Sequence, residues 1–186
     1  MSETAPARAT YRHGNVREEA IAAAYELAVS GGPEALSLRR IAEKIGVTHR
    51  SLYNHFADRD ALIDAVAEVG YTKLGARLKK ADDADGFVRI YVSFALKQPT
   101  LYGLMRSRPH ATMKERPALQ RAAHIGITEA LRVFGRKGAS SAENRRAVMK
   151  VLILLHGGIS MHLNGILDVP GDEGLISEMQ KMVASG

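Results

Sequence analysis

Side chains that can bind nucleic acid are concentrated in the eight residues from Thr48 to His55. Arg50 has the paired donors that match a guanine edge, and Asn54 has the donor and acceptor that match adenine. Tyr53 and His55 carry hydroxyl and imidazole groups that suit phosphate oxygens. These residue types at this spacing therefore predict a surface that binds DNA.

The preceding residues predict the helix that would support this surface. Ser37 can cap a short helix by accepting a backbone hydrogen bond. The inner face of that helix would be formed by Leu38, Ile41 and Ile45. Gly46 follows the last turn, where a positive φ lets the chain reverse without a Cβ clash. A short helix that ends in a tight turn is expected here.

A second helix is expected directly after this turn. Thr48 can cap it, and Leu52 and Phe56, four residues apart, would point into the core. The polar side chains between them are then left facing outward. Two short helices joined by a glycine-containing turn make a helix-turn-helix over residues 37–56. The alternatives are an ordinary helical hairpin with a polar face and a helix-turn-helix that binds only protein partners.

Apolar spacing is helical through the rest of the chain. Stripes with steps of three and four residues run through Val16–Leu27, Leu62–Val69, Phe87–Phe94, Leu119–Phe134 and Val148–Ile159. No stretch alternates with a period of two for long enough to predict a strand. We therefore expect an all-α protein of about nine helices.

Composition excludes several classes of function. The chain has 186 residues and no cysteine, which removes disulfides, zinc ribbons, iron–sulfur clusters and thiol catalysis. His156 and His162 lie about 240° apart around a helix, so they do not form an i, i+4 metal pair. Neither a nucleophile elbow nor a phosphate-binding loop of the Gly-x4-Gly-Lys-Ser/Thr type is present. We therefore expect no enzyme activity, no metal and no cofactor.

The formal net charge of +6 does not by itself locate a DNA-binding surface. Residues 1–60 hold eight basic and eight acidic side chains, so the whole excess lies in residues 61–186. Between Lys97 and Lys150 there are 12 basic and three acidic residues. A solvated basic surface is the default explanation of that excess, and an anionic effector is the alternative.

Membrane insertion and export are not expected. The apolar run over residues 151–167 contains two histidines, an asparagine and three glycines, which a membrane-spanning helix would not favour. The first ten residues lack the basic start and apolar centre of a signal peptide. A chain without cysteine also suits a reducing cytosol.

The apolar stripe from Val148 to Ile159 covers most of its helix and predicts a homodimer. A single bundle cannot fully bury a helix that is apolar nearly all round. Helices over about 143–166 and 171–184 would form a four-helix seam with their copies in a second chain. Gly157 and Gly158 would permit close approach at this seam.

The helix-turn-helix resembles the TetR family of transcriptional regulators. The match is most specific at Ile41-Ala-Glu-Lys-Ile-Gly-Val47 and Ser51-Leu-Tyr-Asn-His-Phe56. Arg59 occupies the place of a lysine that family members carry near the start of the fourth helix. Upstream, Tyr11-Arg-His-Gly-Asn-Val-Arg17 is similar to the YHHGDLR start of one subgroup. By this resemblance the DNA contacts come from Ser37, Thr48, His49, Arg50, Tyr53, Asn54, His55, Arg59 and Tyr11.

The second half of the chain resembles the ligand-binding half of the same subgroup. Residues 98–105 are similar to its P-x-L-Y-x-L-M stretch, and residues 154–158 to its W-H-G segment, with leucine in the tryptophan position. The resemblance implies a helical bundle that holds a small-molecule effector and forms a homodimer. The chain would then divide into a helix-turn-helix domain over 11–60 and an effector-binding and dimerisation domain over 61–186.

An effector pocket is expected in the bundle formed by residues 87–165. Aromatic and methionine side chains make an adaptable apolar wall, and a few polar tips would orient the ligand. The candidate lining residues are Tyr91, Phe94, Tyr102, Met105, Met113, His124 and His156.

The predicted function is that of a bacterial, cytoplasmic, one-component regulator. It would be a repressor that binds a palindromic double-stranded DNA operator as a homodimer and that a small-molecule effector releases. Release would follow from a changed spacing of the two recognition helices, because half-sites about 34–36 Å apart tolerate little error. A helix-turn-helix protein that acts through protein partners, or an activator without a small-molecule effector, is the alternative.

Overall fold

The computed structural model describes residues 15–31, 36–108 and 110–185. Over these residues the chain is all-helical, which confirms the predicted fold class, and nine α-helices and one short 3₁₀ segment are present. In chain order the elements are α1 (Val16–Ser30), α2 (Leu38–Ile45), α3 (His49–Tyr53), α4 (Arg59–Leu78), α5 (Ala84–Lys97), α6 (Pro99–Arg106), η2 (His110–Glu115), α7 (Pro117–Phe134), α8 (Ser141–Leu163) and α9 (Gly171–Ala184).

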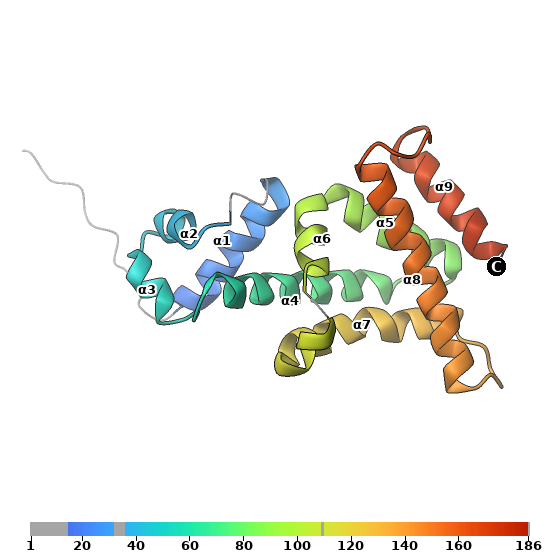
Figure 1. Ribbon diagram of the computed structural model, residues 1–186, viewed down its shortest axis with the longest axis horizontal. Coiled ribbons are helices and arrows are strands. Elements are labelled where there is room, and N and C mark those ends of the chain that lie inside the picture. Colours follow the sequence, from blue (N-terminus) through green and yellow to red (C-terminus); the bar gives the residue numbers. More distant parts are fainter. Residues whose placement is uncertain (1–14, 32–35, 109, 186) are drawn as a thin grey trace, which may run out of the picture.

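The long helix α4 joins the two halves of the molecule. Figure 1 shows α1, α2 and α3 gathered at one end and α5 to α9 at the other, with α4 running between them. With 20 residues α4 is about 30 Å long. It packs against α1 in the first half and against α6 and α7 in the second. A displacement in the larger half can therefore reach the smaller one through a single rigid element.

Local signals start the helices where the sequence places them. Asp58 accepts a hydrogen bond from the Ala61 backbone at 2.7 Å, and Asp83 does the same for Gly86 at 2.8 Å. Ser140 and Glu143 form a reciprocal capping box at the start of α8. Proline stands in the first turn of both α6 and α7, where its missing N–H has no helical partner to lose.

The buried face of α7 is rotated from the predicted stripe. Leu119 is buried as expected, but Leu131 is exposed, Ile127 is only partly buried, and Ala130, which is outside the predicted stripe, is buried. The reason is the close crossing of α4 over α7, which places small side chains of α7 such as Ala122 in the core. A helix that crosses closely turns its small residues, rather than its large ones, toward the neighbour.

Gly75 makes this close crossing possible. A Cβ atom at position 75 would lie 2.9 Å from Cβ of Ile125 on α7, which real side chains do not tolerate. Gly103 on the exposed side of α6 is different, because a Cβ there would meet nothing within 4 Å. The two glycines therefore have opposite structural roles.

Gly75→Ala is expected to lower the free energy of unfolding and Gly103→Ala to raise it. Overpacking costs about 1–3 kcal/mol, and alanine returns at most about 1 kcal/mol of helix propensity at position 75. At position 103 only the favourable term of about 0.4–1 kcal/mol remains. Chemical denaturation of both variants would measure the contrast, and a Gly75→Ala protein as stable as Gly103→Ala would contradict the close crossing.

Candidate nucleic-acid interface and ligand cavity

The predicted helix-turn-helix is formed by local hydrogen bonds. The Ser37 hydroxyl accepts from the Arg40 backbone N–H at 3.2 Å, and the Thr48 hydroxyl accepts from Ser51 at the same distance. Gly46 has φ of 72°, the left-handed conformation that glycine adopts without strain. The two caps and the turn lie where the sequence places them.

Apolar contacts fix the angle between the two short helices. Ile41, Leu52 and Phe56 are buried in one core with residues of α1 and α4. Ala42 is buried in the same core. The second helix is shorter than the pattern suggests, because α3 ends at Tyr53. Phe56 still reaches the core, since its backbone N–H bonds to the Leu52 carbonyl at 2.9 Å.

The predicted DNA-binding side chains on and beside α3 are exposed, whereas Ser37 before α2 is partly buried. Thr48, His49, Arg50, Asn54 and His55 are all exposed. Tyr53 is 50% exposed, and its ring meets that of His49 edge to face with the centroids 5.0 Å apart. An aromatic contact of this kind restricts the two rings before any ligand arrives. Binding of DNA by these residues remains a prediction.

Arg59 has a structural partner that the sequence did not indicate. Its Nε donates to the backbone carbonyl of Leu36 at 2.9 Å, which ties the start of α4 to the residues before α2. Because Nε is occupied, a phosphate contact from Arg59 would use the two terminal nitrogens of its guanidinium. Tyr11, the other candidate outside the two short helices, lies outside the residues that the structure describes.

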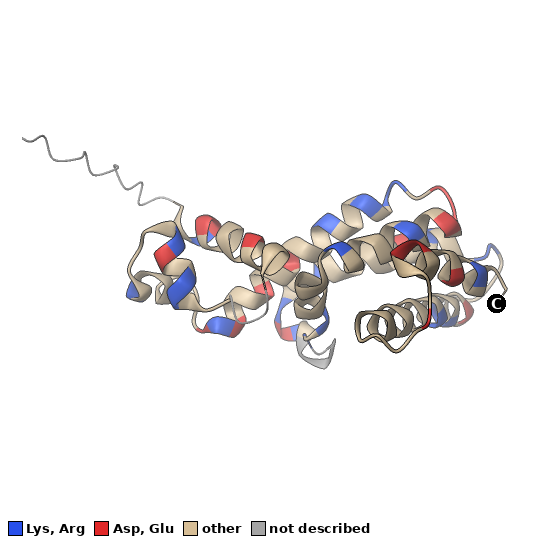
Figure 2. Ribbon diagram, turned by 90° about the horizontal axis from the view of Figure 1, so that it is seen from above, with Lys and Arg blue, Asp and Glu red and all other residues tan. Residues whose placement is uncertain are grey.

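Opposite charges are mixed over α1, α2 and α3. Figure 2 shows Lys and Arg interspersed with Asp and Glu at this end of the molecule. Arg39 pairs with Glu43 at 3.0 Å, and Lys44 pairs with Glu26 at 3.3 Å. Sequence selection at this surface would therefore depend on individual side chains rather than on bulk positive charge.

A cavity of about 380 Å³ lies in the second half, between α4 and the helices packed on it. Six of the seven predicted pocket residues line it: Tyr91, Tyr102, Met105, Met113, His124 and His156. The sequence analysis did not single out the remaining lining residues, which are Tyr71, Leu74, Arg106, Arg108, Gln120, Ala123, Gly126, Ile127 and Leu152. Residues of these types occur throughout the chain, so their types alone do not indicate that they share a cavity.

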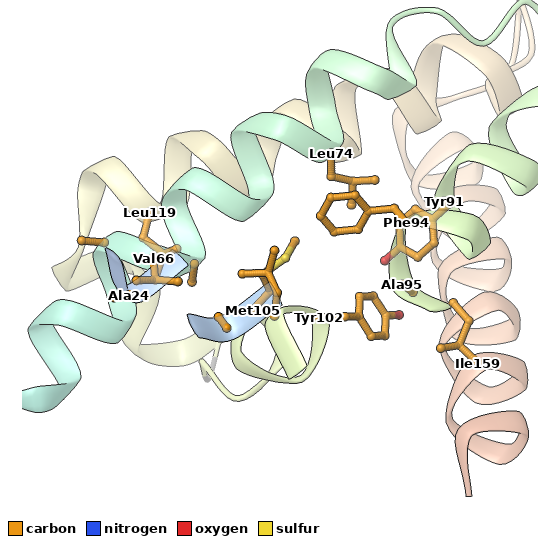
Figure 3. Close-up of a cluster of buried hydrophobic side chains, with 14 of the residues drawn as sticks. Ala24, Val66, Leu74, Tyr91, Phe94, Ala95, Tyr102, Met105, Leu119 and Ile159 are labelled. Carbon is orange, nitrogen blue, oxygen red and sulfur yellow. The ribbon is translucent and has the colours of Figure 1, made fainter. Parts of the chain in front are cut away.

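Phe94 is the exception, and its assignment to the pocket is wrong on geometry. It is fully buried and does not line the cavity. Three residues after Tyr91 on α5, it points about 60° away around the helix. Figure 3 shows it beside Leu74 in the hydrophobic core, and the Arg77 guanidinium lies over its ring at 5.4 Å.

Tyr91, His156 and Tyr102 form a polar cluster in the cavity wall. Tyr102 Oη bonds to Nδ1 of His156, and Tyr91 Oη lies 3.4 Å from Nε2. Burial, with the charge of Arg106 as a smaller cause, lowers the pKa of His156 to about 4. Burial also raises the pKa of Tyr102 to about 12. All three side chains are therefore neutral at pH 7.

An ion-pair network connects the cavity to α4. The Arg108 guanidinium, which lines the cavity, lies 3.3 Å from Asp64 and 3.4 Å from Asp60. Arg116, just before α7, lies 2.9 Å from the other oxygen of Asp64. The segment between α6 and α7 is thus held to the N-terminal half of α4.

A row of apolar residues is exposed along α8. Met149, Ile153 and Met161 stand four and eight residues apart, with Gly157 between the last two. A groove of about 760 Å³ beside this row runs between α7 and α8 and shares His124 and His156 with the cavity. Steps of four place the row on one face of the helix.

The two adjacent glycines of α8 have different surroundings. A Cβ at Gly157 would meet nothing within 4 Å, whereas a Cβ at Gly158 would lie 2.6 Å from Sδ of Met179 on α9. The expectation that both serve a seam between chains is therefore wrong for Gly158. It permits close packing of α8 on α9 within the chain.

By length and composition alone, α8 is also apolar enough to cross a membrane. In the structure it packs against α5, α7 and α9, and Val148, Val151, Leu155 and Ile159 are buried there. It therefore packs into this bundle along one face, while its other face is exposed. Among the residues described, no group of three His, Asp or Glu side chains is placed to hold a metal ion.

A capped helix-turn-helix joined by one long helix to a helical bundle is the architecture of a class of DNA-binding transcriptional regulators. Two family models match this chain: bacterial regulatory proteins of the tetR family over residues 20–66, and the tetracyclin repressor-like C-terminal domain over residues 85–180. The chain belongs to the TetR family of transcriptional regulators, which is not an enzyme family.

Individual relatives match parts of the chain. The tetracycline repressor protein class C of Escherichia coli is 42% identical over 69 residues, which are 37% of this chain and 32% of that protein. The nucleoid occlusion factor SlmA of Edwardsiella ictaluri (strain 93-146) is 30% identical over 115 residues, 57% of each protein. The chain thus spans about a third and somewhat over half of these relatives.

A solved structure matches nearly the whole chain. A protein of unknown function from Rhodococcus sp. RHA1 is 28% identical, covers 96% of this chain and 98% of its own, and superposes with a TM-score of 0.73. The similarity extends through both halves. It therefore supports the arrangement of the helix-turn-helix relative to the bundle as well as each part alone.

Proposed function

We propose that this chain is a repressor that binds a palindromic DNA operator as a homodimer and is released by a small molecule held in the cavity. The proposal rests on one observation: α4 packs with the helix-turn-helix at one end and carries the partners of the cavity residue Arg108, so it connects the exposed face of α3 to the cavity wall. In domain terms, residues 11–60 would bind DNA and residues 61–186 would hold the effector and the second chain. Such a regulator works in the cytoplasm, where its operator lies.

Two copies would associate through α8 and α9. The exposed row of Met149, Ile153 and Met161 is apolar, and the open space at Gly157 would let a second α8 approach closely. An isologous interface places the same row of each chain against its copy. The two recognition helices would then stand on one side of the dimer, as a palindromic operator requires.

Release would be a shift between two arrangements of α4. Arg108 belongs both to the cavity wall and to the ion pairs with Asp60 and Asp64 on α4. A ligand that displaces Arg108 would loosen this connection and bias the position of α4, which carries the helix-turn-helix with it. A small rigid displacement suffices, because the half-sites tolerate little error.

Selection from a random duplex library is expected to return a palindrome, and Arg50→Ala should weaken binding to it. If Arg50 pairs with a base, its loss costs about 1–3 kcal/mol per half-site and relaxes the preference at one position. Arg121→Ala, an exposed arginine on α7, is the matched control and should bind like the unaltered protein. Fluorescence anisotropy on the selected duplex and on single-base variants would measure both.

Two results would contradict the proposal. The first is equal affinity for all duplexes with a steep salt dependence, which indicates phosphate contacts alone. The second is the absence of salt-dependent duplex binding, which would favour a helix-turn-helix that acts through protein partners.

A further inference from the structure

The charged side chains that line the cavity are all of one sign. Its ionisable lining residues are Arg106, Arg108, His124 and His156, together with tyrosines, and no Asp or Glu is among the described lining residues. The segment over residues 109–112, which follows Arg108, also contains no acidic residue in its sequence. A cationic ligand would therefore find no compensating carboxylate in this wall.

The two arginines differ in what balances their charge. Arg108 is only 11% exposed and is paired with Asp60 and Asp64. Arg106 is exposed at the cavity rim, and no described carboxylate lies within 4 Å of it. Its guanidinium lies over the Tyr102 ring, 5.9 Å from the centroid. Residues 102 and 106 share one face of α6, so this cation stands next to the tyrosine–histidine cluster.

Tyr102 is the centre of the hydrogen bonds in this cluster. Its hydroxyl bonds to Nδ1 of His156, and it also has side-chain hydrogen bonds with Tyr91 and with Arg106. The tyrosine hydroxyls are therefore used within the cluster, whereas the Arg106 guanidinium, with its five N–H donors, has further donors for a ligand. Figure 3 shows both tyrosines at the same part of the core, with Tyr91 Oη directed toward Tyr102.

We propose that the cavity takes an organic monoanion, a carboxylate on an apolar body, with Arg106 as its ion-pair partner. This inference rests on the proposed role of the cavity as the effector site. The carboxylate would accept hydrogen bonds from the guanidinium, and charge-assisted bonds of this kind are stronger than neutral ones. Leu74, Met105 and Leu152 would contact the apolar body.

The size of the cavity limits this body to a single ring or a short chain. At about 380 Å³ the cavity is near the lower end of ligand pockets, which span about 300–1,000 Å³. A ligand with two or more charges is not favoured, because Arg106 is the single cation here that lacks a described carboxylate partner. Arg106 is thus the one residue of the basic excess in the second half to which we give a specific role, that of ion-pair partner of the ligand.

The charge preference can be tested with three probes of one shape. 4-Phenylbutanoate, 4-phenylbutanamide and 4-phenylbutylamine share an apolar body and differ in charge at pH 7. Titration calorimetry on the full chain without DNA is expected to show the acid binding at least about tenfold more tightly than the amide, and the amine most weakly. Arg106→Gln should reduce the difference between acid and amide to less than about threefold.

Two further variants separate the anchor from general effects. Tyr102→Phe removes the hydroxyl that hydrogen-bonds to Arg106 and should weaken binding of the acid about three- to tenfold, because the guanidinium is then less well positioned. Arg121→Gln removes an exposed arginine outside the cavity and should keep the full preference. Equal affinities of acid and amide, tighter binding of the amine, or no binding of the acid up to about 10 mM would overturn the inference.

The two proposals fail in distinguishable ways. The calorimetric experiment contains no DNA, so its outcome does not depend on operator binding. A protein that prefers the acid but selects no duplex would overturn the proposed function and leave the anion site standing. A protein that selects a palindrome but does not distinguish acid from amide would overturn the anion site alone.

Discussion

Ile153→Arg is expected to make the protein monomeric and to weaken operator binding by at least about 100-fold. Ile153 is 65% exposed in the single chain and stands in the middle of the apolar row on α8. In an isologous interface the substitution occurs twice near the two-fold axis, so two arginines face one another in an apolar seam. A monomer reaches one half-site and loses the effective concentration that the second recognition helix supplies.

Light scattering at micromolar concentration would report the oligomeric state, and anisotropy would report operator affinity. Because the Ile153 side chain contributes little to the core of its own chain, the helical content should stay unchanged. Ile153→Leu preserves an apolar seam and should remain dimeric. Val29→Arg puts an arginine on an exposed apolar position of α1, away from the proposed seam, and should remain dimeric as well. A dimer that survives Ile153→Arg at the same concentration would place the interface elsewhere.

Asp64→Ala is expected to destabilise the protein strongly. The Asp64 side chain is 15% exposed and holds both Arg108 and Arg116. Its removal leaves a mostly buried guanidinium without its nearer carboxylate. Breaking such a pair from one side costs roughly 2–4 kcal/mol, which lowers the Tm of a domain of this length by about 5–15 °C.

Asp60→Ala is the matched control for this prediction. Asp60 belongs to the same helix and contacts the same arginine, but its side chain is 60% exposed. Solvent screens an exposed pair, so its loss should cost less than about 1 kcal/mol. Scanning calorimetry of both variants would compare them directly. Equal effects of the two substitutions would show that Arg108 does not depend on Asp64.

The sequence by itself determined the helix-turn-helix. Ser37, Gly46 and Thr48 act on backbone groups three to five residues away, so their effect is local and can be recognised without knowledge of the fold. Leu52 on the second helix and Phe56 just after its end are likewise both buried, as their apolar side chains predict. The polar side chains left over are exposed for the same reason.

The sequence also predicted six of the fifteen residues that line the cavity, through the concentration of aromatic and methionine side chains in one half of the chain. It did not separate Phe94 from Tyr91, because both belong to the same apolar stripe of α5. Which member of a stripe meets a cavity depends on how far the helix is rotated about its own axis, and that rotation is set by the neighbouring helices. Arg106 and Arg108 could not be recognised as cavity residues from the sequence, because the second half of the chain contains many other basic residues and helix rotation decides which of them meet the cavity.

Only the tertiary structure decided the contacts between residues far apart in the chain. Gly75 meets Ile125, Gly158 meets Met179, and Arg59 meets the carbonyl of Leu36. Each contact depends on the distance and angle at which two elements cross, and no local propensity encodes either quantity. The ion pairs of Asp64 with Arg108 and Arg116 arise in this way as well. Local chemistry thus specified the predicted DNA-binding surface of this protein, whereas helix packing decided how that surface is connected to the cavity.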